Sequence, residues 1–309
     1  MKLRDYLFII ITSFCVSLKA EPIVYGKLWL TVEHQDTLSG TEVDMVSNAS
    51  RLGVKGSMDF GDGVEVIYQA EYEVDPIDGK ADEKNARSFK QRNTFIGIKG
   101  SYGTLFLGTH DTATKRSIAK IDLFNDLAGD IKNILQGENR MNDFIGYTTP
   151  TLGECFSATF NAIKGTEEEG GNSIGDSTST SLNYKSISLY AAIAFDSDLK
   201  GHDTTRISFQ VPFNRTQIGI IYQDTEELSS GLEENGYVLS LSQKIGEKGV
   251  FKIQLAESDM KMGSGKQTSI GYDYKLSNKA KFFFFFTDLT GDKKSTEKEI
   301  SSLGFEYKF

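Results

Sequence analysis

Cysteine, proline and tryptophan are all scarce in this chain of 309 residues. It has 2 Cys, 4 Pro and 1 Trp. Cys15 lies within the N-terminal apolar run, so Cys155 alone remains for the folded part and an intrachain disulfide is excluded. With so few prolines, few strands are interrupted, because proline cannot donate a ladder hydrogen bond. The fold must therefore be stabilised without disulfides.

Histidines are too few and too scattered to indicate a metal site or a catalytic centre. His34, His110 and His202 are far apart in sequence, and surface histidines are the usual interpretation. Cys155 has no obvious His and Asn partners for nucleophilic catalysis. We therefore expect no metal, no cofactor and no enzymatic activity. An outer-membrane lipase or protease, which needs a Ser/His/acid set, is the least favoured alternative.

Long apolar runs and a net positive charge are also missing. No run after the N-terminus approaches 18 apolar residues, so a membrane helix is not expected. The formal net charge of −9 argues against nucleic acid as a partner. The mean hydropathy of −0.32 is typical of a soluble protein. A transmembrane β-barrel also has a low mean, because lipid-facing and water-facing residues alternate along its strands.

Residues 1–20 have the pattern of a secretory signal peptide. Lys2 and Arg4 give a positive start, the run Leu7–Leu18 is apolar but short, and Ala20 is a plausible last residue before cleavage. No linker-like or low-complexity run divides the rest. We therefore predict an exported single domain at residues 21–309.

The dominant pattern in the chain has a period of two. In Gly63–Asp75 apolar and aromatic residues alternate with Glu65, Gln69, Glu71 and Glu73. The run Ser50–Asp59 also alternates, and only Phe60–Asp62 separates these two runs, which predicts a tight hairpin. Alternation of this kind predicts antiparallel strands with one polar face.

The same pattern predicts about sixteen strands whose connections alternate between short turns and long polar loops. This alternation is the mark of an all-β, transmembrane antiparallel β-barrel. The predicted strands include Val24–His34, Phe89–Lys99, Arg140–Thr149 and Lys279–Leu289, whereas Gln35–Ala49 is predicted as a loop. The longest interval between strands is Gly108–Pro150. We expect its loop, residues 111–138, to fold into the barrel and narrow it, because long ordered loops are usually functional.

Chemistry decides which face meets lipid. A charge near the middle of the bilayer costs about 2–4 kcal/mol, so the charged face must line a water-filled lumen. At the C-terminus Leu303, Phe305, Tyr307 and Phe309 share the lipid face. An aromatic last residue on such a strand resembles the assembly signal of bacterial outer-membrane barrels, which predicts contact with the barrel-assembly machinery.

Five stretches of the chain share one resemblance: YGKLWLTVE (Tyr25–Glu33), Ser47–Asp75, Arg92–Thr112, Ile121–Pro150 and LGFEYKF (Leu303–Phe309). They resemble the Gram-negative general porins, the trimeric sixteen-stranded channels, and most of all the branch found in Neisseria and other proteobacteria. The resemblance implies an outer-membrane location, a homotrimer, and passive diffusion of ions and small hydrophilic solutes.

Porins of this kind oppose basic residues on the barrel wall to acidic residues on the inward loop. A transverse field of this kind across a narrow neck orients solutes, and rings of charge set selectivity. The basic wall candidates are Arg51, Lys55, Arg92 and Arg140. The acidic loop candidates are Asp122, Asp126, Asp130 and Glu138. For each of them the alternative is a solvated charge or an internal ion pair.

Other features leave alternatives open. Phe282–Phe286 places aromatics on both faces of one strand, as a subunit contact or a membrane girdle. The acidic runs Glu167–Glu169 and Glu226–Glu227 are exposed loop charges, or sites for divalent cations that bridge lipopolysaccharide. Trp29, on the lumen face, is one aromatic rather than a ladder for sugars. The alternatives to a general porin are a porin that prefers a sugar or an anion, and a plugged barrel with an adhesive or structural role.

Overall fold

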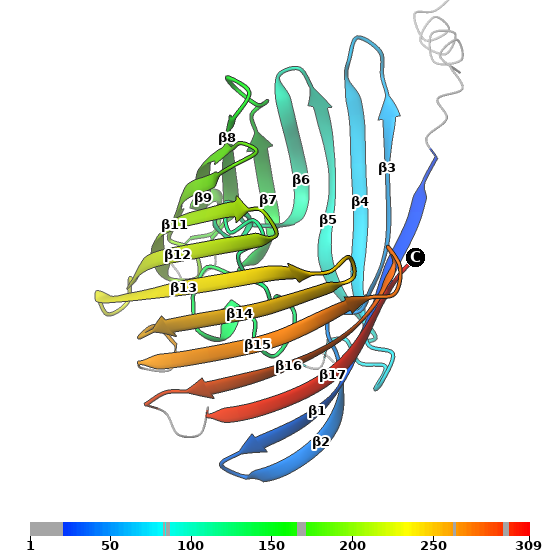
Figure 1. Cartoon of the computed structure of the whole chain (residues 1–309). Helices are drawn as coiled ribbons and strands as arrows, with labels where there is room; N and C mark the ends of the chain where they lie inside the picture. The colour runs from blue at the N-terminus through cyan, green and yellow to red at the C-terminus, as the bar shows by residue number, and fades with distance from the viewer. Residues whose placement is uncertain (1–20, 83, 85–86, 166–170, 262–263, 293–296) are drawn as a thin grey trace, which may run out of the picture.

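The strands of this protein form one closed antiparallel barrel (Figure 1). The computed structural model describes residues 21–309, except 83, 85–86, 166–170, 262–263 and 293–296. Apart from β2 and β3, which both pair with β1, each strand pairs with its neighbour in sequence, and β1 also pairs with the last strand, β17 (Lys298–Lys308). The ring is closed by that pairing, for example between Leu30 and Phe305. Closure leaves no unpaired sheet edge, which an exported barrel without disulfides needs.

The strands have the lengths required to cross a bilayer at a tilt. In the first half they are β1 (Ile23–Thr37), β2 (Gly40–Ser47), β3 (Arg51–Asp59), β4 (Glu65–Val74), β5 (Phe89–Gly100), β6 (Gly103–Asp111), β7 (Arg140–Thr148) and β8 (Phe156–Lys164). In the second half they are β9 (Ile174–Lys185), β10 (Tyr190–Ser197), β11 (His202–Phe213), β12 (Thr216–Glu227), β13 (Leu232–Ile245), β14 (Gly249–Ser258), β15 (Gly265–Lys275), β16 (Ala280–Thr290) and β17.

These labelled segments make sixteen barrel strands, because β2 and β3 are two parts of one strand. One end of β1 pairs with β2 and the other end pairs with β3. The break at Asn48–Ser50 is held by β1: the backbone N–H of Asn48 donates to the Trp29 carbonyl at 2.8 Å, and Ala49 has a φ of 51°. The all-β barrel of about sixteen strands is thus confirmed. The prediction that Gln35–Ala49 is a loop was wrong, because most of that run is strand.

The two faces of the barrel differ as the alternation predicts. Leu255 on β14 and Ile270 on β15 are exposed, whereas the residues that precede them, Gln254 and Ser269, are buried. The same contrast runs around the barrel, so the apolar side chains point outward. A band of outward apolar residues is what a lipid bilayer solvates.

The aromatic run on β16 divides between the two faces. Phe282, Phe284 and Phe286 are exposed on the outer face, whereas Phe283 and Phe285 are 2% and 3% exposed on the inner face. The outward three extend the apolar band. The inward two are buried, so they must pack against other residues inside the barrel.

At the end of β17 the aromatic residues Phe305, Tyr307 and Phe309 are 36%, 41% and 46% exposed on the outer face. Their recognition by assembly machinery stays a prediction. The predicted signal peptide (1–20) and Glu167–Glu169 lie outside the described residues. Across the described ranges, no helix is long and apolar enough to cross a membrane.

Candidate functional site

The connection between β6 and β7 is an ordered chain of short turns and helices, and we refer to residues 112–139 as the 112–139 segment. It begins with α2 (Ala113–Arg116), whose Thr112 side chain caps the Lys115 N–H. It also contains the 3-10 helix η2 (Ile131–Asn133), whose Asp130 side chain caps the Lys132 N–H. Capping by Thr and Asp satisfies backbone donors that a helix start leaves free. These caps fix the local shape of the segment.

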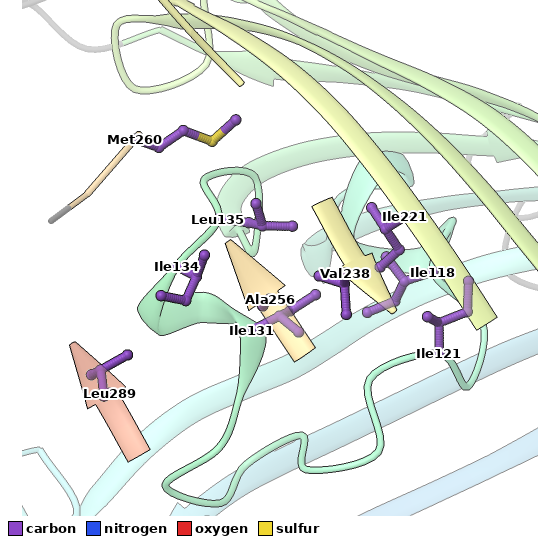
Figure 2. Packing of buried hydrophobic residues seen from close by; sticks show 10 residues of the cluster. All are labelled: Ile118, Ile121, Ile131, Ile134, Leu135, Ile221, Val238, Ala256, Met260 and Leu289. Carbon is purple, nitrogen blue, oxygen red and sulfur yellow. The ribbon is translucent and has the colours of Figure 1, made fainter. Parts of the chain in front are cut away.

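One side of the 112–139 segment is apolar and packs on the barrel (Figure 2). Its buried residues meet side chains from the inner faces of β12, β13, β14 and β16, and burying each large aliphatic side chain contributes about 1.5–3 kcal/mol. The cluster contains Ile118, Ile121, Ile131, Ile134, Leu135, Ile221, Val238, Ala256, Met260 and Leu289.

Glycines on the inner faces of β12 and β13 allow this close approach. A Cβ added at Gly219 would lie 2.7 Å from Ile121, and one added at Gly236 would lie 2.7 Å from Leu135. Such distances are shorter than van der Waals contact, so any larger residue would push the segment away. Glycines at these positions therefore leave room for Ile121 and Leu135, and we refer to the inner surface of β12–β16 on which the 112–139 segment packs as its seat.

A second apolar cluster explains the inward phenylalanines of β16. Phe283 and Phe285 pack with Phe124 and Leu127 of the 112–139 segment and with Trp29 of β1. The Phe124 and Phe285 rings meet edge to face with centroids 6.0 Å apart, a favoured aromatic geometry. The run Phe282–Phe286 therefore contains two of the residues against which the 112–139 segment packs.

Glutamines on the inner faces of β14 and β15 hold the backbone of the segment. Gln254 accepts the Leu123 N–H at 2.8 Å and donates to the Gly129 carbonyl at 3.0 Å. Gln267 donates to the same carbonyl at 2.7 Å. Buried backbone groups of a loop need partners of this kind.

A buried ion pair fixes the end of the segment that returns to β7. Arg206 of β11, 0% exposed, reaches Glu138 with an Nη1–Oε1 distance of 2.6 Å. It also donates to the Gln136 carbonyl at 2.7 Å and to the side chain of Gln223 at 2.7 Å. Arg206 was not among the residues predicted from the sequence, although its inward position on a regularly alternating strand was a sign of it. Glu138, a predicted acidic loop residue, is placed in this anchor.

Asp126 faces the predicted basic wall. Its carboxylate is 2.6 Å from Arg51 Nη2 and 3.9 Å from both Arg92 Nη2 and Lys27 Nζ. Burial raises the pKa of Asp126, but the charges of Arg92, Arg51 and Lys27 outweigh burial and hold the pKa below its ordinary value. Asp126 is therefore a carboxylate at neutral pH.

The two arginines of this group also bind acidic residues of β4. Arg92 Nε lies 2.9 Å from Glu71 and its Nη1 lies 3.0 Å from Glu73. Arg51 Nη1 lies 3.7 Å from Glu71. With Lys27 and Asp126, the group is thus a network of three basic and three acidic side chains, whose charges balance.

Arg140 and Lys115 form a second basic group. Arg140 Nη2 lies 2.9 Å from Asp111, and Arg140 Nε donates to Asn93 at 2.8 Å. Lys115 Nζ lies 3.5 Å from the same Asp111 oxygen. One carboxylate therefore serves two cations here. Lys55, the remaining wall candidate, lies apart, with its Nζ 5.2 Å from the centroid of the Tyr25 ring.

Two of the predicted acidic residues bind the backbone of their own segment. Asp122 accepts the N–H groups of Phe124 and Ile131 at 3.0 and 3.3 Å, and Asp130 accepts that of Asp126 at 2.8 Å. Burial, together with Asp130 and Glu138, raises the pKa of Asp122 well above its ordinary value. Of the four acidic candidates, the structure brings only Asp126 to the basic wall.

Two cavities border the 112–139 segment. One, of about 450 Å³, is lined among others by Arg92, Asp126 and Arg140. The other, of about 580 Å³, is lined among others by Arg116, Lys120 and Asp122. Within the described ranges, no group of three or more His, Cys, Asp or Glu side chains is arranged to hold a metal ion. The lining of the first cavity is mainly polar and charged, as suits water and ions, whereas the second is also lined by Ile118 and Leu123.

Comparison with known proteins gives the family of this barrel. The family model described as Gram-negative porin matches residues 9–294. The chain belongs to the Gram-negative porins. These are outer-membrane β-barrels that act as passive channels and not as enzymes, so the expected channel class is confirmed.

Individual porins show the same relationship. Outer membrane porin protein 32 of Delftia acidovorans is 26% identical over 286 residues, which cover 85% of this chain and 78% of that protein. The major outer membrane protein P.IB of Neisseria gonorrhoeae is 19% identical over 269 residues, or 82% of this chain and 74% of that protein. A structure titled anion-selective porin from Comamonas acidovorans has a TM-score of 0.77 and 19% identity, and it covers 94% of this chain and 100% of its own.

Proposed function

We propose that this porin forms a water-filled outer-membrane channel for passive diffusion of ions and small hydrophilic solutes, narrowed by the 112–139 segment. The observation that carries the proposal is the one-sided packing of the segment. Its apolar residues are buried against the strands from β12 to β16. Its residue Asp126 faces Arg51 of β3 and Arg92 of β5 on another part of the barrel wall. A neck bordered by opposed charges selects ions by their sign.

We also propose how the channel is exported, assembled and placed in the membrane. The mature chain starts after a cleaved signal peptide (1–20), associates as a homotrimer and contacts lipid and lipopolysaccharide through its outer face. The support is the band of exposed apolar residues around the barrel. The terminal residues Phe305, Tyr307 and Phe309 are the proposed contact with the assembly machinery.

A preference for anions is the second candidate, and a specific observation favours it. Around the segment Arg51, Arg92, Arg140, Lys27 and Lys115 lie near four acidic partners. These five basic residues therefore exceed their acidic partners by one charge, although the whole chain has a net negative charge. The structurally similar protein from Comamonas is titled anion-selective, which agrees with this candidate.

The test is single-channel conductance of the refolded mature protein in a planar bilayer, with the reversal potential measured across a salt gradient. We expect stepwise openings with weak ion selectivity. Arg140→Ala and Asp126→Ala should shift the reversal potential in opposite directions. A folded barrel without conductance would refute the diffusion channel and leave a plugged barrel with a surface role.

A further inference from the structure

The short turns at one end of the barrel differ in charge between its two halves. The turns that follow β9, β11, β13 and β15, with the adjoining strand ends, are residues 185–189, 212–216, 244–249 and 275–280, and we refer to them as the basic turns. Their charged residues are Lys185, Arg215, Lys244, Lys248, Lys275, Lys279 and Glu247. The turns that follow β3 and β7 contain the acidic residues Asp62 and Glu154 instead. Positive charge is therefore concentrated in one half of this rim.

The six basic side chains are not used in ion pairs within the chain. All six are exposed, and in the part of the chain that the structure describes no carboxylate lies within 4.0 Å of any of them. Nearby Lys281, in contrast, is paired with Asp273 at 2.8 Å. Positive charges held together at one rim repel one another and attract an anionic partner from outside the chain.

Apolar and aromatic side chains in the same region indicate the kind of partner. Phe213 is 67% exposed, Ile245 49% and Leu276 44%. Tyr274, at the end of β15, is exposed on the outer face, and the Nζ of Lys248 lies 6.0 Å from the centroid of its ring. Aromatic rings with lysine and arginine beside them are typical of a membrane–water interface, where the rings lie at the level of the headgroups and the cations reach toward the polar side. A soluble anionic polymer would leave these apolar side chains in water.

We propose that the basic turns bind the phosphate groups of anionic phospholipids in the adjacent membrane leaflet. Outer-membrane barrels have their short turns on the periplasmic side, so this leaflet is the inner one. The opposite ends of β11, β12 and β13 carry Asp203, Glu226 and Glu233, which are aligned across the three strands. The attraction is therefore confined to the short-turn end. The inference goes beyond the channel function, because it concerns the lipid around the barrel and not the solutes within it.

A tryptophan placed beside the basic turns reports which lipid surrounds them. Tyr274→Trp keeps an aromatic ring at this position, and the native Trp29 is 7% exposed on the inner face. The refolded protein is measured in phosphatidylcholine vesicles that contain equal fractions of either dibrominated phosphatidylglycerol or dibrominated phosphatidylcholine. Bromine quenches tryptophan fluorescence only at short range, so stronger quenching by the anionic lipid measures its enrichment at position 274.

We expect the anionic lipid to be enriched, and the enrichment to fall when charge is removed. One lysine near an anionic surface contributes about a fivefold gain in binding. Lys248→Gln and Lys279→Gln, each combined with Tyr274→Trp, should therefore lower the enrichment by up to about fivefold. Salt at about 1 M should also lower it, because the Debye length falls to about 3 Å. The circular dichroism signal of the barrel checks the fold of each variant.

The other half of the rim supplies matched controls. Tyr102, 45% exposed, lies in the turn between β5 and β6, outside the basic turns, so Tyr102→Trp should be quenched equally by the two lipids. Lys99 beside it is paired with Glu65 at 3.7 Å. Lys99→Gln should therefore leave the quenching at position 274 unchanged.

The outcomes separate this inference from the proposed channel. Equal quenching by the two lipids at position 274 would overturn the inference, and so would an enrichment that Lys248→Gln and Lys279→Gln together leave unchanged. Binding of the solubilised barrel to soluble polyglutamate without lipid enrichment would overturn it in favour of an aqueous polymer. A barrel that conducts but shows no enrichment refutes only this inference, whereas enrichment around a barrel that does not conduct refutes only the channel.

Discussion

Replacing Arg206 is the most direct way to test how the 112–139 segment is held. Its guanidinium binds Glu138, the Gln136 carbonyl and Gln223 at 2.6–2.7 Å, and Arg206 is fully buried. In Arg206→Met the Glu138 carboxylate, whose side chain is 5% exposed, stays buried without a counter-charge. Breaking one partner of such a pair costs about 3–5 kcal/mol, which we expect to release the end of the segment.

The assay measures the segment and the barrel separately. Limited proteolysis of the refolded protein should cut Arg206→Met within residues 112–139, where the wild type is protected, while far-ultraviolet circular dichroism keeps the β-barrel signal. Single-channel recordings should show a larger and noisier conductance, because a released segment no longer narrows the lumen.

A double-mutant cycle supplies the control. Arg206→Met with Glu138→Gln removes both charges, so it should recover most of the protection that the single variant loses. Equal protection of Arg206→Met and the wild type would refute the anchor. Failure of the double variant to recover would show that the other hydrogen bonds of Arg206, and not the ion pair, hold the segment.

Three further predictions concern the seat and the charges of the segment. Gly236→Val should displace Leu135, because an added Cβ would lie 2.7 Å from it, and unchanged conductance would contradict the seat. Phe283→Ala should cost about 3 kcal/mol and expose the segment to protease without unfolding the barrel, and equal protease resistance would argue against this packing. Asp126→Asn should shift selectivity toward anions. The pKa of Asp126 is lowered, so its ion pairs contribute fully above the ordinary carboxyl pKa of about 4 and are lost only as pH falls through the lower folded value. The difference in reversal potential between Asp126→Asn and the wild type should therefore persist from pH 8 to about pH 5, and loss of that difference within this range would refute the assignment.

The period-two pattern was sufficient to predict the barrel. Because side chains alternate across a strand, one sheet face had to be apolar and the other charged, and about sixteen such strands joined alternately by short turns and long loops are typical of a closed barrel in lipid. The missed strand β2 shows the limit of the pattern. Its residues Gly40–Ser47 are polar at one end, and their pairing depends on the long partner strand β1 rather than on their own propensity.

The fold class, the family and part of the charged residues around the 112–139 segment followed from the sequence alone, whereas Arg206 did not. Only the tertiary structure decided how those charges pair, because the partners lie far apart in the chain: Arg51 with Asp126, and Arg206 with Glu138. Parity gives the face of a strand on which a residue lies, but not its height relative to a loop from elsewhere. The packing of Phe124 on Phe285, and the seat that Gly236 leaves for Leu135, set that height and so give each charge its neighbours.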